Sequence, residues 1–318
     1  LRYDNSEDVL LGEMSNKGGR KWQPKIRQLL RENTFNVFVI NGFYHYTSLY
    51  LLYYAFTRRI PAVFISDNVA AEDWGYLKLI YECVKLRLLK CICRAFWVPG
   101  RAGTAYLQSL GAIRSEAIFP GAYVMDMLEI KKTYSLYRDQ RTELRSRYGF
   151  GAEDRVLLMA ANFIENRQHT LLAEAFVRVA KKHNNLRLLL LGEGPCHEQA
   201  KEVIRIAGLE SKVVFPGGVP FDKLPNAYAV SDLYIHAGAE PYSTAVMYAA
   251  YLGLPLCVSN SVGAVQDVLH DEQNGFAFAS GSLEELVRVL EKSSQLSEDE
   301  LSSMAAKSLE IANFYEPN

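Results

Sequence analysis

The sequence predicts an α/β protein made of two parallel-sheet domains. Short apolar segments typical of buried strands alternate with longer segments of helical periodicity. The alternation breaks once, over residues 121–133, and a complete second series then begins. Because strands that alternate with helices form parallel sheets, we expect one sheet on each side of the break. The domain boundary is expected near residue 128, which gives domains 1–128 and 129–318.

The first half begins with a polar stretch, residues 1–22, that contains Gly18 and Gly19 and is expected to form a loop. Apolar residues then recur at helical spacing over 24–33. Strands are expected at 35–40, 61–66, 95–99 and 116–120, and helices at 43–59, 76–94 and 102–110. An ordinary domain of this class has further strands before residue 36, so the first domain is expected to lack its N-terminal part.

The second half repeats the pattern with more strands. A charged helix is expected over 134–148, where Gly149 ends it. Strands are expected at 156–160, 186–191, 213–215, 233–236 and 256–259, and helices at 171–183, 198–207 and 225–230, after Pro241 and from residue 283 onward. Gly253 and Pro255 stop the helix that begins after Pro241.

The composition is that of a globular chain whose partners are not nucleic acids. The 318 residues are 49% hydrophobic and 22% charged, which is enough to bury a large core in two domains. The net charge of −1 gives no general attraction to nucleic acid. Five scattered cysteines, with Cys91 and Cys93 as the only close pair, are a poor zinc signal and favour a reduced, cytoplasmic protein. No apolar run reaches the ~18 residues of a spanning helix.

Residues 76–94 combine an apolar helix with a local cluster of positive charge. The basic residues are Lys78, Lys85, Arg87, Lys90 and Arg94. Such a helix can lie on an anionic membrane surface, which would place the protein at the inner face of the membrane. A helix that packs on the sheet and keeps its basic side in water has the same pattern. The pattern allows both interpretations.

Polar residues follow the first two expected strands. Asn41 ends one strand, Ser66 and Asp67 end the next, and His45 lies near the start of the intervening helix. Because the carboxyl ends of parallel strands meet at one edge of the sheet, these four residues are candidates for a cleft. A capping role for Asp67 and a surface position for His45 fit the pattern equally well.

Four loops of the second half follow strands and carry residues suited to a ligand. They are Asn162 to Arg167, Gly192 to Pro195, Gly217 to Gly218 and Gly238 to Thr244. Glycine lets the backbone approach a flat or anionic ligand closely, and Arg167 provides a fixed positive fork for phosphate. The four loops in one domain indicate a nucleoside diphosphate derivative held across the sheet edge.

The segment 235–258 predicts a strand, a loop, a helix and a second strand. Pro241 suits a helix start, and Ser243 and Thr244 can cap it, so the unpaired N–H groups there attract an anion such as phosphate. Glu240 stands beside this anion site. It is either a cap or an acceptor of hydrogen bonds from the hydroxyls of a bound sugar.

These loops resemble those of the group 1 (family 4) retaining glycosyltransferases, which have two Rossmann-like domains in the GT-B fold. The likeness covers roughly residues 35–318 and is tightest over 156–279. The matching motifs are Gly192-Glu193-Gly194-Pro195, Phe215-Pro216-Gly217-Gly218, Glu240-Pro241-Tyr242-Ser243, Gly253-Leu254-Pro255 and Asn274-Gly275-Phe276. In the first half, Asn41-Gly42-Phe43 and Val98-Pro99-Gly100 look like bacterial members that act on cell-surface glycans.

The resemblance implies transfer of a sugar from a nucleotide donor, of UDP or GDP type, to a glycan or lipid-linked acceptor. Transfer would retain the anomeric configuration and need no metal or other cofactor. Arg167 and the N–H groups of Ser243 and Thr244 would stabilise the departing diphosphate, and Glu240 would hold the donor sugar. The other implied donor-side positions are Asn162, Gly192, Gly194, Gly218 and Tyr248. On the acceptor side Asp67 is the first choice for catalysis and His45 the second, with Asn41 and Ser66 beside them.

Three positions depart from the family pattern. Asn162 stands where the family has a basic residue, so Arg167 is the one cation left for the diphosphate. Tyr248 stands eight residues after Glu240, where the family has an acid that binds ribose hydroxyls, and a phenol cannot accept two hydroxyls as a carboxylate can. Ser66-Asp67 stands where many members have a histidine.

Two other functions compete with transfer. A GT-B-shaped protein that binds a nucleotide sugar or a partner without catalysis is favoured by Asn162, Tyr248 and the incomplete first domain. A nucleotide-sugar epimerase on the same fold is disfavoured, because it predicts clustered acids and histidines in both halves. His236 and Glu240 alone do not supply them.

Overall fold

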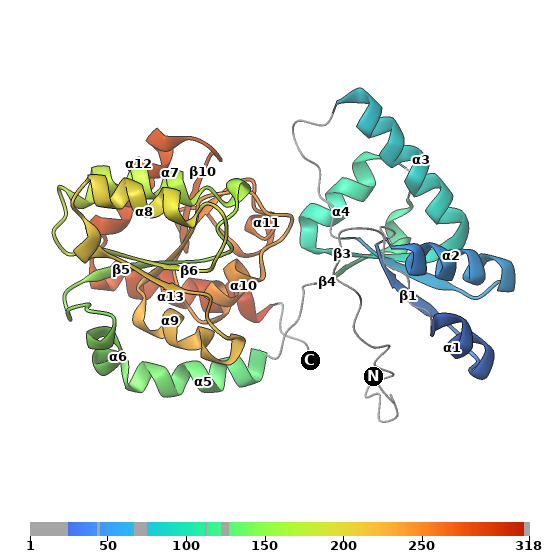
Figure 1. Cartoon of the computed structure of the whole chain (residues 1–318), viewed down its shortest axis with the longest axis horizontal. Helices are drawn as coiled ribbons and strands as arrows, with labels where there is room; N and C mark the ends of the chain where they lie inside the picture. The colour runs from blue at the N-terminus through green and yellow to red at the C-terminus, as the bar shows by residue number, and fades with distance from the viewer. Residues whose placement is uncertain (1–24, 43–44, 67–74, 112, 122–126, 315–318) are drawn as a thin grey trace. The chain divides into compact units, whose positions relative to one another are not determined.

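The computed structural model describes residues 25–42, 45–66, 75–111, 113–121 and 127–314. These residues fold into two compact units (Figure 1). The first unit is drawn from Leu1–Val98 and Gly103–Pro120, and the second from Pro99–Ala102 and Gly121–Asn318. Each unit contains a parallel sheet with helices, which confirms the predicted α/β class.

The first unit contains a four-stranded sheet in the order β1-β2-β3-β4. Its strands are β1 Phe38–Asn41, β2 Ala62–Ile65, β3 Cys93–Pro99 and β4 Ile118–Gly121, and its helices are α1 Ile26–Glu32, α2 Tyr46–Arg58, α3 Tyr76–Ile92 and α4 Gly100–Ser109. The core is built on alternate strand residues such as Phe38, Ile40 and Phe64, which are buried. Val39 of β1 is 57% exposed, so among the described residues this strand is covered on one face only, although its apolar run is typical of a buried strand.

The second unit contains a six-stranded parallel sheet in the order β10-β9-β8-β5-β6-β7. The strands are β5 Arg155–Ala160, β6 Leu186–Leu191, β7 Val213–Gly217, β8 Leu233–His236, β9 Leu256–Ser259 and β10 Gly275–Phe278. The chain runs outward from β5 to β7, then returns to the other side of β5 with β8. That reversal is a topological switch point, where the carboxyl ends of β5 and β8 leave a crevice for a ligand.

Helices cover both faces of this second sheet (Figure 1). One apolar cluster joins the sheet to α7 His169–Ala180, α8 His197–Ile206 and α12 Leu283–Gln295. The other joins it to α5 Met127–Asp139, α9 Leu224–Val230, α10 Thr244–Tyr251 and α13 Glu298–Asn313. The remaining helices are α6 Arg141–Arg147 and the short α11 Val265–Val268.

Two elements of the second unit differ from the prediction. The expected helix 134–148 is two helices, α5 and α6, which meet at Gln140, and α5 begins at Met127 inside the stretch expected to be irregular. Met127 and Ile130 pack into the core at helical spacing, and this apolar contact fixes the extra turns. The four-residue strand β10, Gly275–Phe278, was not among the predicted strands.

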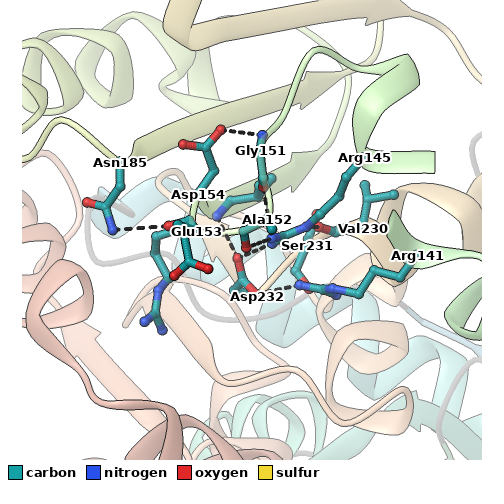
Figure 2. A network of polar contacts seen from close by, with 12 residues as sticks. Arg141, Arg145, Gly151, Ala152, Glu153, Asp154, Asn185, Val230, Ser231 and Asp232 are labelled. Carbon is teal, nitrogen blue, oxygen red and sulfur yellow. Dashed lines mark hydrogen bonds and ion pairs between the residues drawn. The ribbon is translucent and has the colours of Figure 1, made fainter. Parts of the chain in front are cut away.

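A buried polar network fastens α6 to the starts of β5 and β8 (Figure 2). The carboxylate of Asp232 contacts Arg141 Nη2 at 2.5 Å and Arg145 Nη2 at 2.6 Å, and it also accepts the N–H of Val156 at 2.7 Å. Arg145 Nε donates to the carbonyl of Val230 at 2.9 Å. Burial lowers the pKa of Arg141 to about 10, and Asp232 opposes this effect. One carboxylate thus balances two largely buried guanidinium groups.

Candidate functional site

A cavity of about 410 Å³ opens at the carboxyl ends of β5 and β6 in the second unit. Its walls come from the loops after β5, β6 and β7 and from the first turns of α10. Five of the predicted donor-side residues line it: Asn162, Gly192, Gly218, Thr244 and Tyr248. The sequence pattern did not single out Glu193, Phe221 and Tyr228, which also line it.

Two positions in these loops require glycine, because other backbone atoms lie too close to admit a Cβ atom. Gly192 has φ +131°, and a Cβ atom there would lie 2.1 Å from the carbonyl oxygen of Ala161. A Cβ on Gly238 would lie 2.1 Å from the carbonyl oxygen of Asn166. At each of these two glycines the backbone therefore passes the loop after β5 more closely than any side chain allows. Gly194 has φ +150° but is outside the cavity lining.

The helix α10 begins at the cavity with a serine cap. Ser243 Oγ accepts the N–H of Val246 at 3.4 Å, and Ser243 itself has φ +79°, a conformation that favours glycine. The N–H groups of Thr244 and Ala245 precede the first intrahelical hydrogen bond. Since Thr244 and Ala245 both line the cavity, this helix start can hold an anion there.

Arg167 and Glu240, predicted as separate ligand groups, form an ion pair. Arg167 Nη2 lies 2.8 Å from Glu240 Oε1, and Arg167 Nη1 also donates to the carbonyl of Ala239. Their side chains are 14% and 25% exposed. Neither residue lines the cavity, but Glu240 precedes Thr244, which does, by four residues. The pair thus holds a guanidinium and a carboxylate in fixed positions beside the helix start.

Two buried histidines lie behind this pair. His236 Nε2 is 3.6 Å from Glu240 Oε2, yet burial lowers the pKa of His236 to about 3, with Arg167 acting in the same direction. Burial also lowers the pKa of His169, to about 4, and its ring stacks on Phe163 at 3.8 Å. Both imidazoles are therefore neutral near pH 7, so Arg167 is the charged partner of Glu240.

These histidines predict a loss of stability in mild acid. Each folded-state pKa lies below the unfolded value near 6.5, so protons bind the unfolded chain more tightly. As far as these two histidines are concerned, the free energy of unfolding is highest above about pH 6.5. It decreases as the pH falls toward their folded-state pKa values of about 4 and 3. Each histidine should remove about 1.4 kcal/mol of unfolding free energy per pH unit below that value.

Urea unfolding between pH 6.5 and 5 measures this slope. The His236→Asn variant should show roughly half the slope attributable to the two histidines. The exposed His270 provides the control variant His270→Asn, which should keep the full slope. Equal slopes in the wild type and in His236→Asn would contradict the assignment.

Tyr248 lines the cavity and is 5% exposed, and its buried hydroxyl has no hydrogen-bond partner among the described residues. Burial raises the pKa of this phenol, so it stays protonated. Its ring lies 5.9 Å from that of Phe221. Glu193 Oε1, by contrast, already accepts the N–H of Gly218 at 3.3 Å.

The first unit places Asn41 and Ser66 at the carboxyl ends of the paired strands β1 and β2. Asn41 is exposed, Ser66 is buried, and the N–H of Ser66 donates to the carbonyl of Trp97 at 3.0 Å. His45 occupies the position before the first residue of α2. Asp67 lies outside the described residues. The acceptor-side assignments stay predictions.

The second unit has a doubly wound sheet, and a helix start that can hold an anion lies at its switch point. These two features are typical of nucleotide-binding domains. The model of the family "Glycosyl transferases group 1" matches residues 140–308, which is more than half of the chain. The chain belongs to this family. Among the described residues, no group of three or more His, Cys, Asp or Glu side chains is placed to hold a metal ion.

Curated relatives match about half of this chain or less. The GPI3 subunit of phosphatidylinositol N-acetylglucosaminyltransferase from Saccharomyces cerevisiae is 25% identical over 162 residues, 51% of this chain and 34% of that protein. A GDP-mannose-dependent alpha-(1-6)-phosphatidylinositol monomannoside mannosyltransferase from Mycobacterium tuberculosis is 28% identical over 140 residues, 42% of this chain and 36% of that protein. The chain spans about a third of the length of these relatives.

A solved structure extends the likeness to both units. Alr3699/HepE from Anabaena, in complex with UDP and glucose, matches 92% of this chain and 76% of that chain with a TM-score of 0.73 and 19% identity. At that identity the likeness establishes the fold, which is the GT-B fold expected from the sequence.

Proposed function

We propose that this chain transfers a sugar from a nucleoside diphosphate sugar to a glycan or lipid-linked acceptor, with retention and without a metal. UDP and GDP are the proposed donor nucleotides. The observation that carries the proposal is the Arg167–Glu240 ion pair in the segment that leads into α10, the helix whose first turn lines the cavity. It joins a phosphate-binding group and a hydroxyl-binding group in one place.

This arrangement suits the negative charge of the leaving diphosphate. The N–H groups of Thr244 and Ala245 point from the helix start, where the helix dipole favours an anion. Arg167 adds a guanidinium held in place by Glu240 and by the carbonyl of Ala239. Groups that are already oriented stabilise developing charge without reorganising during the reaction.

Glu240 is suited to the donor sugar. One carboxylate oxygen, Oε1, is engaged by Arg167, and neutral His236 lies 3.6 Å from the other. Oε2 has capacity for hydrogen bonds from sugar hydroxyls. Hydrogen bonds from hydroxyls to a carboxylate are charge-assisted and roughly twice as strong as hydrogen bonds between neutral groups.

The relatives support this choice of substrates. One is named as GDP-mannose-dependent, and two are named for transfer to phosphatidylinositol-based acceptors. The Anabaena structure was determined with UDP and glucose. Nucleotide sugars and lipid-linked acceptors are therefore the first substrates to test.

The direct test is label transfer from UDP- and GDP-sugars to bacterial lipid and glycan extracts by the whole chain. The variant Glu240→Gln should transfer about 10- to 100-fold less label, because it loses a charge-assisted hydrogen bond to the sugar. The variant Glu284→Gln, at an exposed ion pair with Arg178, is the control. Binding of a nucleotide sugar without turnover would instead support the non-catalytic alternative.

The helix α3 supports a membrane partner for the first unit. Its buried side includes Leu86 and Leu89, but Leu77 is 83% exposed and Leu88 63% exposed. Further exposed residues are Tyr76, Lys78, Ile80, Tyr81, Val84, Arg87 and Lys90. The acid of this helix, Glu82, is buried and paired with Lys85. An apolar face flanked by exposed cations matches an anionic lipid surface. No helix in the described ranges is long and apolar enough to cross a membrane.

Co-sedimentation with vesicles tests this partner. The chain should bind phosphatidylglycerol-containing vesicles, and Leu88→Asp should reduce the bound fraction at least about tenfold by adding a charge and removing apolar contact. Ile206→Asp alters an equally exposed apolar residue, 73% exposed, in the second unit and should bind as the wild type does. Equal binding of both variants would contradict the proposed surface.

A further inference from the structure

The first unit contains a larger cavity, of about 740 Å³, that the proposed function does not use. Arg27 and Arg31 line it from α1, and Tyr50, Tyr54 and Arg58 line it from α2. Within each helix these residues recur at intervals of four, so each set lies along one face of its helix. Three arginines and no acidic residue therefore line this cavity.

The cavity lies at the amino ends of the strands β1 and β2. Its lining includes Thr34, in the segment that leads into β1, and Ile60, in the segment that leads into β2. The acceptor-side candidates Asn41 and Ser66 lie at the carboxyl ends of the same strands, at least about 10 Å away along them. The cavity also lies outside residues 140–308, which the family model matches. It is therefore separate from both parts of the proposed transfer site.

Aromatic rings orient two of the three guanidinium groups. Arg27 Cζ lies 5.7 Å from the centre of the Tyr50 ring, and Arg58 Cζ lies 5.7 Å from the centre of the Tyr54 ring. The hydroxyl of Tyr54 donates to the carbonyl of Leu30 at 3.3 Å, which ties α2 to α1. A guanidinium that stacks on a ring keeps the N–H donors along its edges available for oxygen atoms.

The positive charge of this lining is not balanced within it. The acid of α1, Glu32, accepts a hydrogen bond from Gln28 at 2.7 Å and is outside the lining. Neither Arg31 nor Arg58 forms an ion pair with any of the described residues. Like charges around one cavity repel each other, so an anion with several charges bound there would lower the electrostatic energy.

We propose that this cavity binds a ligand that carries two phosphate groups. Three arginines match about three negative charges. A diphosphate or a pair of phosphate monoesters supplies them, because one monoester carries about −1.5 to −2 near pH 7. Phosphate oxygens also fit the planar fork of a guanidinium, whereas a single carboxylate would leave two of the three cations unpaired. The cavity volume is in the range of about 300–1,000 Å³ that is typical of sites for small molecules.

Calorimetric titration of the whole chain with inorganic pyrophosphate tests this site. Inorganic phosphate should bind at least about tenfold more weakly than pyrophosphate, because it engages fewer guanidinium groups. The double variant Arg31→Ala, Arg58→Ala should weaken pyrophosphate binding at least about tenfold. Both arginines are exposed, so their removal leaves the core intact. Arg58→Lys should weaken binding at least about threefold, because an ammonium group lacks the planar fork.

A matched control removes the same net charge elsewhere. The double variant Arg114→Ala, Arg288→Ala replaces two exposed arginines outside the cavity lining and should bind pyrophosphate as the wild type does. Arg167→Ala, in the second unit, should also leave binding at this cavity unchanged. Absence of pyrophosphate binding, or binding that survives the loss of Arg31 and Arg58, would overturn the proposal. Neither result would bear on the proposed sugar transfer.

A second measurement distinguishes the two sources of paired phosphates, a soluble molecule and a lipid headgroup. The chain is sedimented with phosphatidylcholine vesicles that contain or lack diacylglycerol pyrophosphate. Sedimentation that requires this lipid and is lost in Arg31→Ala, Arg58→Ala would assign the site to a headgroup. Binding of pyrophosphate in solution without such sedimentation would assign it to a soluble ligand.

Discussion

The Asp232→Ala variant is expected to unfold on the order of 10 °C below the wild-type chain. Asp232 pairs with both Arg141 and Arg145 (Figure 2). It also accepts the N–H of Val156. Removing it leaves two largely buried guanidinium groups without their counter-charge. Breaking one side of a buried ion pair typically costs about 3–5 kcal/mol.

Calorimetric unfolding of the wild-type chain and three variants measures this effect. Asp232→Asn keeps an acceptor for Val156 but removes the charge, so its unfolding temperature should fall between those of the wild type and Asp232→Ala. Glu143→Ala breaks an exposed pair with Arg147 in the same helix and should shift stability by less than about 1 kcal/mol. Equal unfolding temperatures for Asp232→Ala and Glu143→Ala would show that the network contributes no more to stability than an exposed ion pair does.

The Arg167→Ala variant is expected to lose about a hundredfold or more of the transfer rate, while the proposed acceptor site is unchanged. Asn162 occupies the other position where the family has a cation, so Arg167 is the predicted positive side chain for the diphosphate. Removal of one oriented group that stabilises transition-state charge costs about 10²–10³ in rate. The loss should appear mainly in kcat.

The control for this variant is Arg178→Ala, which removes an exposed arginine of α7 that pairs with Glu284. Single-turnover assays with the labelled donor that supports transfer separate chemistry from donor binding. A rate for Arg167→Ala within threefold of the control would show that the helix start alone carries the leaving group. The proposed role of Arg167 would then be wrong.

Periodicity was sufficient to predict most of the strands and the two-unit α/β organisation. The strand Leu186–Leu191 is apolar except for Arg187, its leucines are buried on both faces, and Gly192 follows it directly, so local chemistry specifies it. The start of α5 was missed because its core residues, Met127 and Ile130, are fixed by contact with elements distant in the sequence. Tertiary packing of this kind is not visible in a local pattern.

The loops were predictable, but the contacts between them were not. Gly192 and Thr244 were expected at a common edge, and the structure brings them to one cavity. The pairing of Arg167 with Glu240 joins residues 73 positions apart, and it depends on the backbone path that carries Gly238 against Asn166. The unmet hydroxyl of Tyr248 likewise follows from burial in three dimensions.

The helix α10 links the candidate site to the folding cooperativity of its unit. Its residues from Val246 to Tyr251 are all buried, so their amide protons can exchange with solvent only when the surrounding structure opens. A ligand bound at Thr244 therefore stabilises the element that the unit must disrupt in order to unfold. Hydrogen exchange should slow across the second unit on binding, at a distance from the ligand as well as beside it.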